Sequence, residues 1–150
     1  MLGPALEADY GTSLEALVKL LTFAVPLLPR FGFEIVDVRD VASLHRLALE
    51  REASVGQRLV ASNGFLWFRE IAAVLKEQYP GRKIPLREMP NWLTKLARFF
   101  VPEIGSFIAD LDVVKNLDNG PAKELDWDPN APAEAIRAGA ESLVRLGVVP

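Results

Sequence analysis

The residues best suited to chemistry lie in one stretch, residues 37–45, which reads DVRDVASLH. It holds Asp37, Arg39 and Asp40 at its start and the chain's only histidine, His45, at its end. Carboxylates beside an arginine can bind a polar ligand, and a histidine can act as a general base near neutral pH. These four residues are therefore the first candidates for a site.

Each of them also has a local structural explanation. The sequence places no second catalytic group beside His45, so a histidine satisfied within its own helix is the favoured interpretation. Asp40 precedes a helical apolar pattern, which favours a helix N-cap over a ligand contact. For Arg39, ligand binding and pairing with Asp37 or a neighbouring element are equally open.

Motifs that bind nucleotides are absent from the sequence. Its ten glycines form neither GxGxxG nor GxxxxGK[ST]. A dinucleotide pyrophosphate needs such a turn, because only glycine lets the backbone approach the phosphates closely. We therefore predict no cofactor site in this chain alone.

A second apparent motif also fails as chemistry. Tyr79 and Lys83 have the spacing of a catalytic YxxxK pair, which requires both side chains on one helix face. Pro80 and Gly81 lie between them and break the helix. We therefore predict no catalytic residue in this chain.

Composition narrows the class of protein. The chain has 150 residues, a formal net charge of −3, a pI of about 5.2 and no cysteine. This length suits one compact domain spanning residues 1–150. A mildly acidic chain gives no electrostatic reason to expect nucleic acid or an anionic membrane as partner. Without cysteine and with one histidine, disulfides, thiolate chemistry and multi-histidine metal sites are excluded.

Targeting signals are not apparent. The first residues lack the basic start and apolar run of a signal peptide, and the apolar runs are too short to span a bilayer. We therefore expect a cytoplasmic protein.

The elements that must position these residues follow from periodicity and from proline and glycine. Alternation predicts short strands at residues 33–38, 57–62 and 112–117. Apolar spacing predicts helices at residues 12–23, from 40, from about 68 to 79, 90–100, 103–111, from 121, and from 132 to 146. Thr12 or Ser13 would cap the first helix, Pro26 and Pro29 would follow its end, and Gly147 would close the last. The fold class is a helix-rich α+β domain with a few short strands.

The three tryptophans are treated as packing residues. Trp67, Trp92 and Trp127 are more typical of a core or an interface than of a ligand platform.

Four segments in order carry a resemblance to a known family. They are FEIVDVRDVASLHRLALE, RLVASNGFLWFREIAAVLKEQYP, RKIPLREMPNWLTKLARFF and NLDNGPAKELDWDPNAPAEAIRAGAESLVRLGVV. Together they resemble the C-terminal, substrate-binding part of extended short-chain dehydrogenase/reductases, in the dihydroflavonol-reductase-like branch of the NAD-dependent epimerase/dehydratase family. The resemblance covers nearly the whole chain.

The chain departs from the family at two places. Trp67 stands where the family has a serine helix cap, so we expect Asn63 or water to serve instead. Gly120 and Pro121 stand where the family often has serine and lysine, which removes any polar contact made by that lysine.

The resemblance implies a missing domain. In the family, an N-terminal Rossmann domain carries the glycine-rich NADP(H) turn, the catalytic serine and the helical YxxxK pair. By the same resemblance, Gly3 and Pro4 lie in a loop near the nicotinamide, Asp37 and Arg39 lie where the segment meets the cofactor domain, and Trp92 belongs to the pocket wall. NADP(H) is implied for a full-length parent and not for this chain alone.

Three functions remain open from the sequence. The first is a truncated substrate-binding lobe of an NADP(H)-dependent reductase, inactive alone. Its partners would be the missing Rossmann half, a small-molecule substrate, or a second copy covering apolar surface at Leu2, Phe33, Ile35 and Val36. The second is a free-standing protein-interaction module derived from this lobe. The third is an autonomous enzyme using Asp37, Arg39 and His45.

Overall fold

The computed structural model describes residues 1–97 and 108–150. Its longer helices are α1 (Thr12–Leu21), α2 (Val38–Glu50), α3 (Phe68–Gln78), α4 (Asn91–Ala97) and α7 (Pro132–Arg145). The shorter elements are strands β1 (Gly32–Glu34) and β2 (Phe65–Trp67), helix α6 (Gly120–Lys123), and 3-10 turns at Glu52–Ser54 and Ile108–Asp110. The helix-rich α+β prediction is confirmed. Among the described residues, no helix is both long and apolar enough to cross a bilayer.

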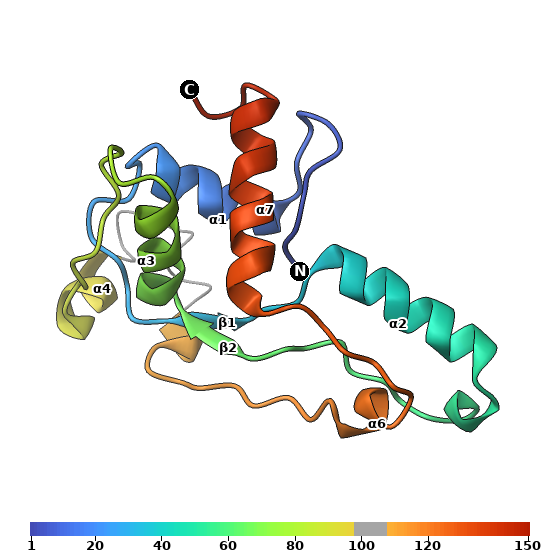
Figure 1. Ribbon diagram of the computed structural model, residues 1–150. Helices are drawn as coiled ribbons and strands as arrows, with labels where there is room; N and C mark the ends of the chain where they lie inside the picture. The colour runs from blue at the N-terminus through green and yellow to red at the C-terminus, as the bar shows by residue number, and fades with distance from the viewer. Residues whose placement is uncertain (98–107) are drawn as a thin grey trace.

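Helices α1, α3 and α7 form the main body of the molecule. In Figure 1, α7 stands in the middle with α1 and α3 on one side, and α2 projects from the other side. Beneath them, β1 and β2 pair antiparallel, with Gly32 opposite Trp67 and Glu34 opposite Phe65. Gly32 is required at that crossing, because a Cβ there would lie 2.3 Å from the Phe65 ring.

The main body encloses the larger of two apolar cores. Its fully buried side chains come from α1, α3 and α7 and include Leu17, Leu20, Ile71, Leu75, Ile136 and Leu143. Small residues on α7 let α1 and the N-terminal segment approach closely. A Cβ at Gly139 would lie 3.1 Å from the Gly3 carbonyl oxygen and from Leu14 and Leu17. We call this the large core.

A second cluster packs α2 against the segment around α6. It contains Val36, Leu44, Leu47, Ala122 and Trp127, all buried. We call it the small core. Its residues come from the predicted strand–helix stretch and from the late LDNGPAKELDW segment, so it joins two distant parts of the sequence.

Three strand predictions need correction. The strand expected at residues 33–38 ends at Glu34, and residues 57–62 and 112–117 form no strand. Beyond Glu34, Ile35 still exchanges backbone hydrogen bonds with Asn63 and Gly64. Gly64 has φ +124°, however, which breaks the regular pleat at that point. Residues 59–61 are half-buried without a strand partner, and residues 112–117 are exposed, so alternation of residue types did not indicate pairing at either place.

Several predicted helix ends also differ. Gly11, and neither Thr12 nor Ser13, is the N-cap of α1. That helix ends at Leu21, before Pro26 and Pro29, because Phe23 turns into the left-handed region at φ 57°. Gly147, at φ +71°, closes α7 as predicted.

At both places where the chain departs from the family it resembles, a nearby carboxylate accepts a backbone N–H. Glu70 Oε2 accepts the Trp67 backbone N–H at 2.8 Å, so Glu70 caps α3. The expectation that Asn63 does so is wrong, since its side chain binds the Asn130 carbonyl at 2.7 Å. Before α6, Asp118 Oδ1 accepts the Gly120 N–H at 2.8 Å.

Two further expectations concern the exposure of four apolar residues and the helices predicted at residues 90–100 and 103–111. Leu2, Ile35 and Val36 are buried and Phe33 is half-buried, so the expectation that they form an exposed apolar surface is wrong. Self-association stays a prediction. The backbone of Leu2 bonds Val36 and Val38. The helix expected at residues 90–100 is seen as α4 up to Ala97. The rest of it, and most of the helix expected at 103–111, lie outside the described residues.

Candidate functional site

Asp37 lies at the N-terminus of α2 with its side chain fully buried. Its Oδ1 accepts the Arg39 backbone N–H at 2.8 Å and Arg39 Nε at 2.9 Å. Its Oδ2 accepts Arg39 NH2 at 2.6 Å. Asp37 is therefore the N-cap of α2, and the open question about Arg39 resolves in favour of pairing with Asp37.

The Asp37–Arg39 pair has a defined electrostatic state. Burial raises the pKa of Asp37, but the hydrogen bonds and positive charge of Arg39 outweigh burial, so the pKa lies below its ordinary value of 3.8. The same pairing raises the pKa of Arg39. Asp37 is thus a fixed anion with its oxygens occupied. The guanidinium of Arg39 remains about half exposed on its outer side.

Asp40 has a different role from the one predicted. Its Oδ2 accepts the Asn130 N–H at 2.9 Å and its Oδ1 accepts Asn130 Nδ2 at 2.7 Å. Its backbone carbonyl accepts Trp127 Nε1 at 2.9 Å. The N-cap interpretation of Asp40 is therefore wrong, because Asp37 occupies that position three residues earlier. Asp40 instead ties α2 to the segment that leads into α7.

His45 agrees with its local explanation. It is exposed on α2, and its Nδ1 lies 2.8 Å from the Val41 carbonyl oxygen. Asp37, the acidic member of the hypothetical site formed with Arg39 and His45, lies about two turns from His45 and is paired with Arg39. Asp37, Arg39 and His45 therefore do not assemble into a catalytic constellation.

The N-terminal loop does meet the start of α2. Leu2 N donates to Val36 O at 2.8 Å and Val38 N donates to Leu2 O at 2.7 Å, in a parallel bridge. Gly3 follows at φ +123°, where a Cβ would lie 2.8 Å from Val38 Cγ1 and 2.9 Å from Asp37 Oδ1. The structure thus brings the Gly3–Pro4 loop to Asp37 and Arg39, although more than thirty residues separate the two segments in the sequence.

Tyr79 and Lys83 form no catalytic pair. Tyr79 follows the last residue of α3, and burial raises its pKa. Lys83 Nζ instead sits over the Phe23 ring, 4.3 Å from its centroid. The expected break at Pro80 is therefore borne out.

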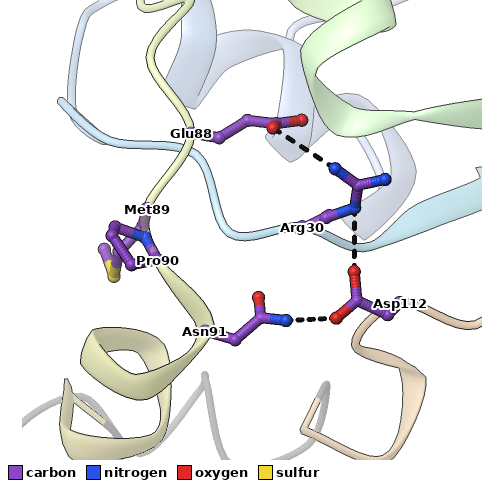
Figure 2. Close-up of a pocket in the computed structure, with 6 residues that line it drawn as sticks. All are labelled: Arg30, Glu88, Met89, Pro90, Asn91 and Asp112. Atoms are coloured by element: carbon purple, nitrogen blue, oxygen red, sulfur yellow. Dashed lines mark hydrogen bonds and ion pairs between the residues drawn. The ribbon is translucent and has the colours of Figure 1, made fainter.

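A pocket of about 370 Å³ lies elsewhere, between the loop before β1 and the segment entering α4. Figure 2 shows its rim, formed by Arg30, Glu88, Met89, Pro90, Asn91 and Asp112. Residues 88–91 precede Trp92, which the resemblance places in a substrate-pocket wall, and they line this pocket. The substrate role of that wall stays a prediction. Trp92 does not line it and is 68% exposed.

Backbone hydrogen bonds fix the walls of this pocket. Leu28 N donates to Arg87 O at 2.9 Å and Met89 N donates to Leu28 O at 2.7 Å, so Leu28 and Glu88 form a parallel bridge. Asp112, in the left-handed region at φ 60°, donates its N–H to Arg30 O at 3.0 Å. Three separate segments are therefore held in one place.

The charged groups of the pocket are linked through Arg30. Its Nε lies 2.8 Å from Asp112 Oδ1, and its NH1 lies 3.7 Å from Glu88 Oε2. Its guanidinium sits over the Trp67 ring, 5.2 Å from the centroid. Asn91 Nδ2 donates to the second oxygen of Asp112. No sequence motif links Arg30 to Asp112, which lie far apart in the chain. Only the folded structure shows that they belong to one group.

A second hollow of about 360 Å³ lies between the 62–65 stretch and the 114–119 segment. Its acidic residue, Glu34, is bonded to the Ser62 hydroxyl and to the Leu117 N–H. Asn119 Nδ2 donates to Ser62 O at 2.6 Å. These polar groups hold the two segments together, so we assign the hollow a packing role.

The described residues do not fit a dinucleotide. The N-terminus of α2, which follows β1, is occupied by the carboxylate of Asp37, where a pyrophosphate would need free backbone N–H groups. Gly3, Gly56, Gly64 and Gly147, the glycines with positive φ, are scattered over different loops. In the same residues, no group of three or more His, Asp or Glu side chains could hold a metal ion.

Comparison with curated proteins gives related reductases. The chain is 31% identical over 85 residues to a cinnamoyl-CoA reductase of Medicago truncatula, covering 57% of this chain and 26% of that protein. It is 36% identical over 53 residues to the NADPH-dependent methylglyoxal reductase of Saccharomyces cerevisiae, covering 35% of this chain and 16% of that protein. The matched parts thus span about a quarter or less of these relatives. No family model matches.

Solved structures of similar fold cover the chain almost completely. The structure of gox2253 superposes with a TM-score of 0.77 at 21% identity, over 99% of this chain and 48% of that one. Yeast methylglyoxal/isovaleraldehyde reductase Gre2, complexed with NADPH, gives a TM-score of 0.69 at 23% identity, over 99% of this chain and 42% of that one. The fold described here accounts for less than half of each.

Proposed function

The chain fits the C-terminal part of an extended short-chain dehydrogenase/reductase, as its sequence predicted, and on that premise we propose that it is the substrate-binding half of an NADP(H)-dependent carbonyl reductase. The observation that carries the proposal is the pocket lined by Arg30 and Glu88. It lies in a domain whose described residues do not fit a dinucleotide. Binding and cofactor chemistry are thereby assigned to different parts of one enzyme.

The residues of this chain would bind and orient the substrate. Arg30 offers N–H donors to a carbonyl or hydroxyl oxygen, and Glu88 offers an acceptor. No tyrosine–lysine pair lies at the pocket within the described residues. Because reduction requires the reacting carbon to be held against a nicotinamide, neither half sets that geometry alone. The isolated chain is therefore inactive in this proposal.

The surface of α2 supports a domain partner. Val38, Ala42, His45 and Leu49 are exposed at helical spacing on the face opposite Leu44 and Leu47. Leu49 is 89% exposed, and the half-free guanidinium of Arg39 lies at the start of the same helix. A cofactor-binding half that completes the reductase would cover this stripe, as its resemblance to enzymes of about twice its length implies.

Cofactor binding tests the division of roles. The 150-residue chain should show no saturable NADPH binding in calorimetric titration. Both described helices that follow a strand have a carboxylate at the N-terminus, Asp37 at α2 and Glu70 at α3. The same chain joined to an upstream Rossmann domain should bind NADPH. Micromolar saturable binding by the short chain would contradict the proposal.

Activity tests the proposal directly. We expect NADPH oxidation with aldehydes, ketones or dihydroflavonols for the chain joined to the Rossmann domain, and none for the 150-residue chain. Arg39→Ala should lower activity of the joined form, since Arg39 lies at the proposed junction. Arg46→Ala is the matched control, because Arg46 lies on the same helix and pairs only locally with Glu50 at 2.7 Å. Turnover by the short chain, at a rate equal to the joined form, would refute the reading.

A further inference from the structure

We propose that Glu88 makes the pocket at Arg30 selective for carbonyl compounds that carry no negative charge. The proposal deepens the substrate-binding role and rests on it. It concerns the charge of the substrate, which neither the fold nor the relatives determine.

The pocket carries an unbalanced negative charge. Among the described residues, its rim holds one cation, Arg30, and two carboxylates, Glu88 and Asp112. Both oxygens of Asp112 already accept a hydrogen bond, one from Arg30 Nε at 2.8 Å and the other from Asn91 Nδ2. The charge of Arg30 is therefore matched by Asp112, and Glu88 supplies the excess.

Glu88 retains room to accept a hydrogen bond from a ligand. Its nearest cationic atom, Arg30 NH1, lies 3.7 Å away, which is too long for a hydrogen bond. Its side chain is 33% exposed, and Figure 2 shows its carboxylate at one end of the rim with Asn91 at the other. A hydroxyl or ammonium group can donate to this carboxylate, whereas a second carboxylate or a phosphate would face it without a shared proton.

Arg30 does not turn toward an incoming anion without losing contacts. Its guanidinium edge is bonded to Asp112 and its face lies on Trp67. Asp112 is in turn held by its N–H on the Arg30 carbonyl. NH1 and NH2 can still donate to a neutral carbonyl oxygen, which asks for no compensating charge. The arrangement thus favours neutral oxygen acceptors and disfavours anions.

Rigid backbone underlies the selection. The parallel bridge between Leu28 and Glu88 holds the backbone of Glu88 beside the segment that carries Arg30, so the two charged side chains start from fixed neighbouring positions. A charge held this way discriminates by position rather than by average potential.

Three small ketones of equal carbon number test the proposal on the 150-residue chain itself. Hydroxyacetone is uncharged, aminoacetone is cationic and pyruvate is anionic near neutral pH. Binding is followed from the backbone amide shifts of Glu88, Met89, Asn91 and Asp112 in two-dimensional ¹H–¹⁵N spectra. We expect aminoacetone and hydroxyacetone to bind at least about tenfold more tightly than pyruvate, a ratio set by one uncompensated charge at short range.

The variant Glu88→Gln sharpens the result. It keeps the shape and removes the charge, so pyruvate should gain at least about tenfold in affinity while hydroxyacetone changes little. Glu77→Gln is the matched control. It makes the same change in net charge, but Glu77 pairs with Arg137 at 2.9 Å between α3 and α7, away from the pocket. Its pyruvate affinity should equal that of the parent.

Two outcomes overturn the proposal: pyruvate binding as tightly as hydroxyacetone, or an unchanged ratio in Glu88→Gln. The joined reductase separates this failure from that of the function. Turnover of anionic and neutral ketones with equal kcat/KM would refute the charge selection and leave the reductase proposal standing. Absence of any turnover would refute the reductase proposal, while the binding series would still decide the charge selection.

Discussion

The large core and the small core are held together by different forces. Between α1, α3 and α7, fully buried leucine, isoleucine and alanine side chains dominate, and close contact depends on Gly139. Around α2, five buried apolar residues are supplemented by hydrogen bonds to Asp40, which we call polar clamps. The Asp40 carboxylate accepts from Asn130, and its backbone carbonyl accepts from Trp127 Nε1. Figure 1 shows the consequence, since α2 projects from a compact body.

The difference teaches how each region should respond to damage. Apolar burial is proportional to area and shared by many neighbours, so loss in the large core is felt by the whole domain. Hydrogen bonds are directional, so loss of one clamp leaves specific groups unsatisfied and the rest intact. The region nearest the proposed domain junction is thus the one held by the fewest, most specific contacts.

Leu75→Ala should produce the largest effect. Leu75 is fully buried on α3 at the centre of the large core, and truncation there should cost roughly 2–5 kcal/mol of unfolding free energy. Urea denaturation followed by circular dichroism measures it. Leu49→Ala, at an exposed leucine of α2, is the control and should change stability little. Equal losses in both would break the comparison.

Asp40→Ala should be smaller and local. It removes the carboxylate that accepts two hydrogen bonds from the exposed residue Asn130, a loss of about 1–3 kcal/mol for the two bonds. Hydrogen exchange should rise across α2 while α7 stays protected. Asp128→Ala, an exposed aspartate near the same segment, serves as control. A uniform rise over α3 and α7 would show that the two cores unfold as one unit.

Asp37→Asn should have the smallest effect, and one that depends on pH. The lowered pKa of Asp37 means that its ionised form stabilises the fold at pH above its ordinary value of 3.8, and that this stability is lost as pH falls through the folded-state pKa. Neutral-pH stability should fall by about 1 kcal/mol, because asparagine still caps α2 but cannot form the ion pair with the partly exposed Arg39. The difference from the parent should vanish in strong acid. A pH-independent difference would indicate that shape, not charge, matters at this position.

Local signals predicted the helices well where they were strong. The amphipathic pattern of α3 and the proline and glycine that bound α7 act within a few residues, and both helices lie where expected. Strand predictions at residues 57–62 and 112–117 failed, because a short run of β-branched and apolar residues does not by itself supply a pairing partner. Single caps were displaced by one to three residues, as for Asp40 and Asp37, because several polar residues compete for the same N–H groups.

The sequence by itself determined that no glycine-rich nucleotide motif is present and where the long helices lie. The positions of the glycines and of Pro80 are properties of the sequence itself. Helix formation depends mainly on residues three and four positions apart, so a local pattern can predict it. Only the tertiary structure decided that Asp37 caps α2 while Asp40 clamps Asn130, and that Arg30, Glu88 and Asp112 share one pocket. Those groupings depend on where distant segments meet in space. That meeting is set by the packing of the whole chain, and no local pattern records it.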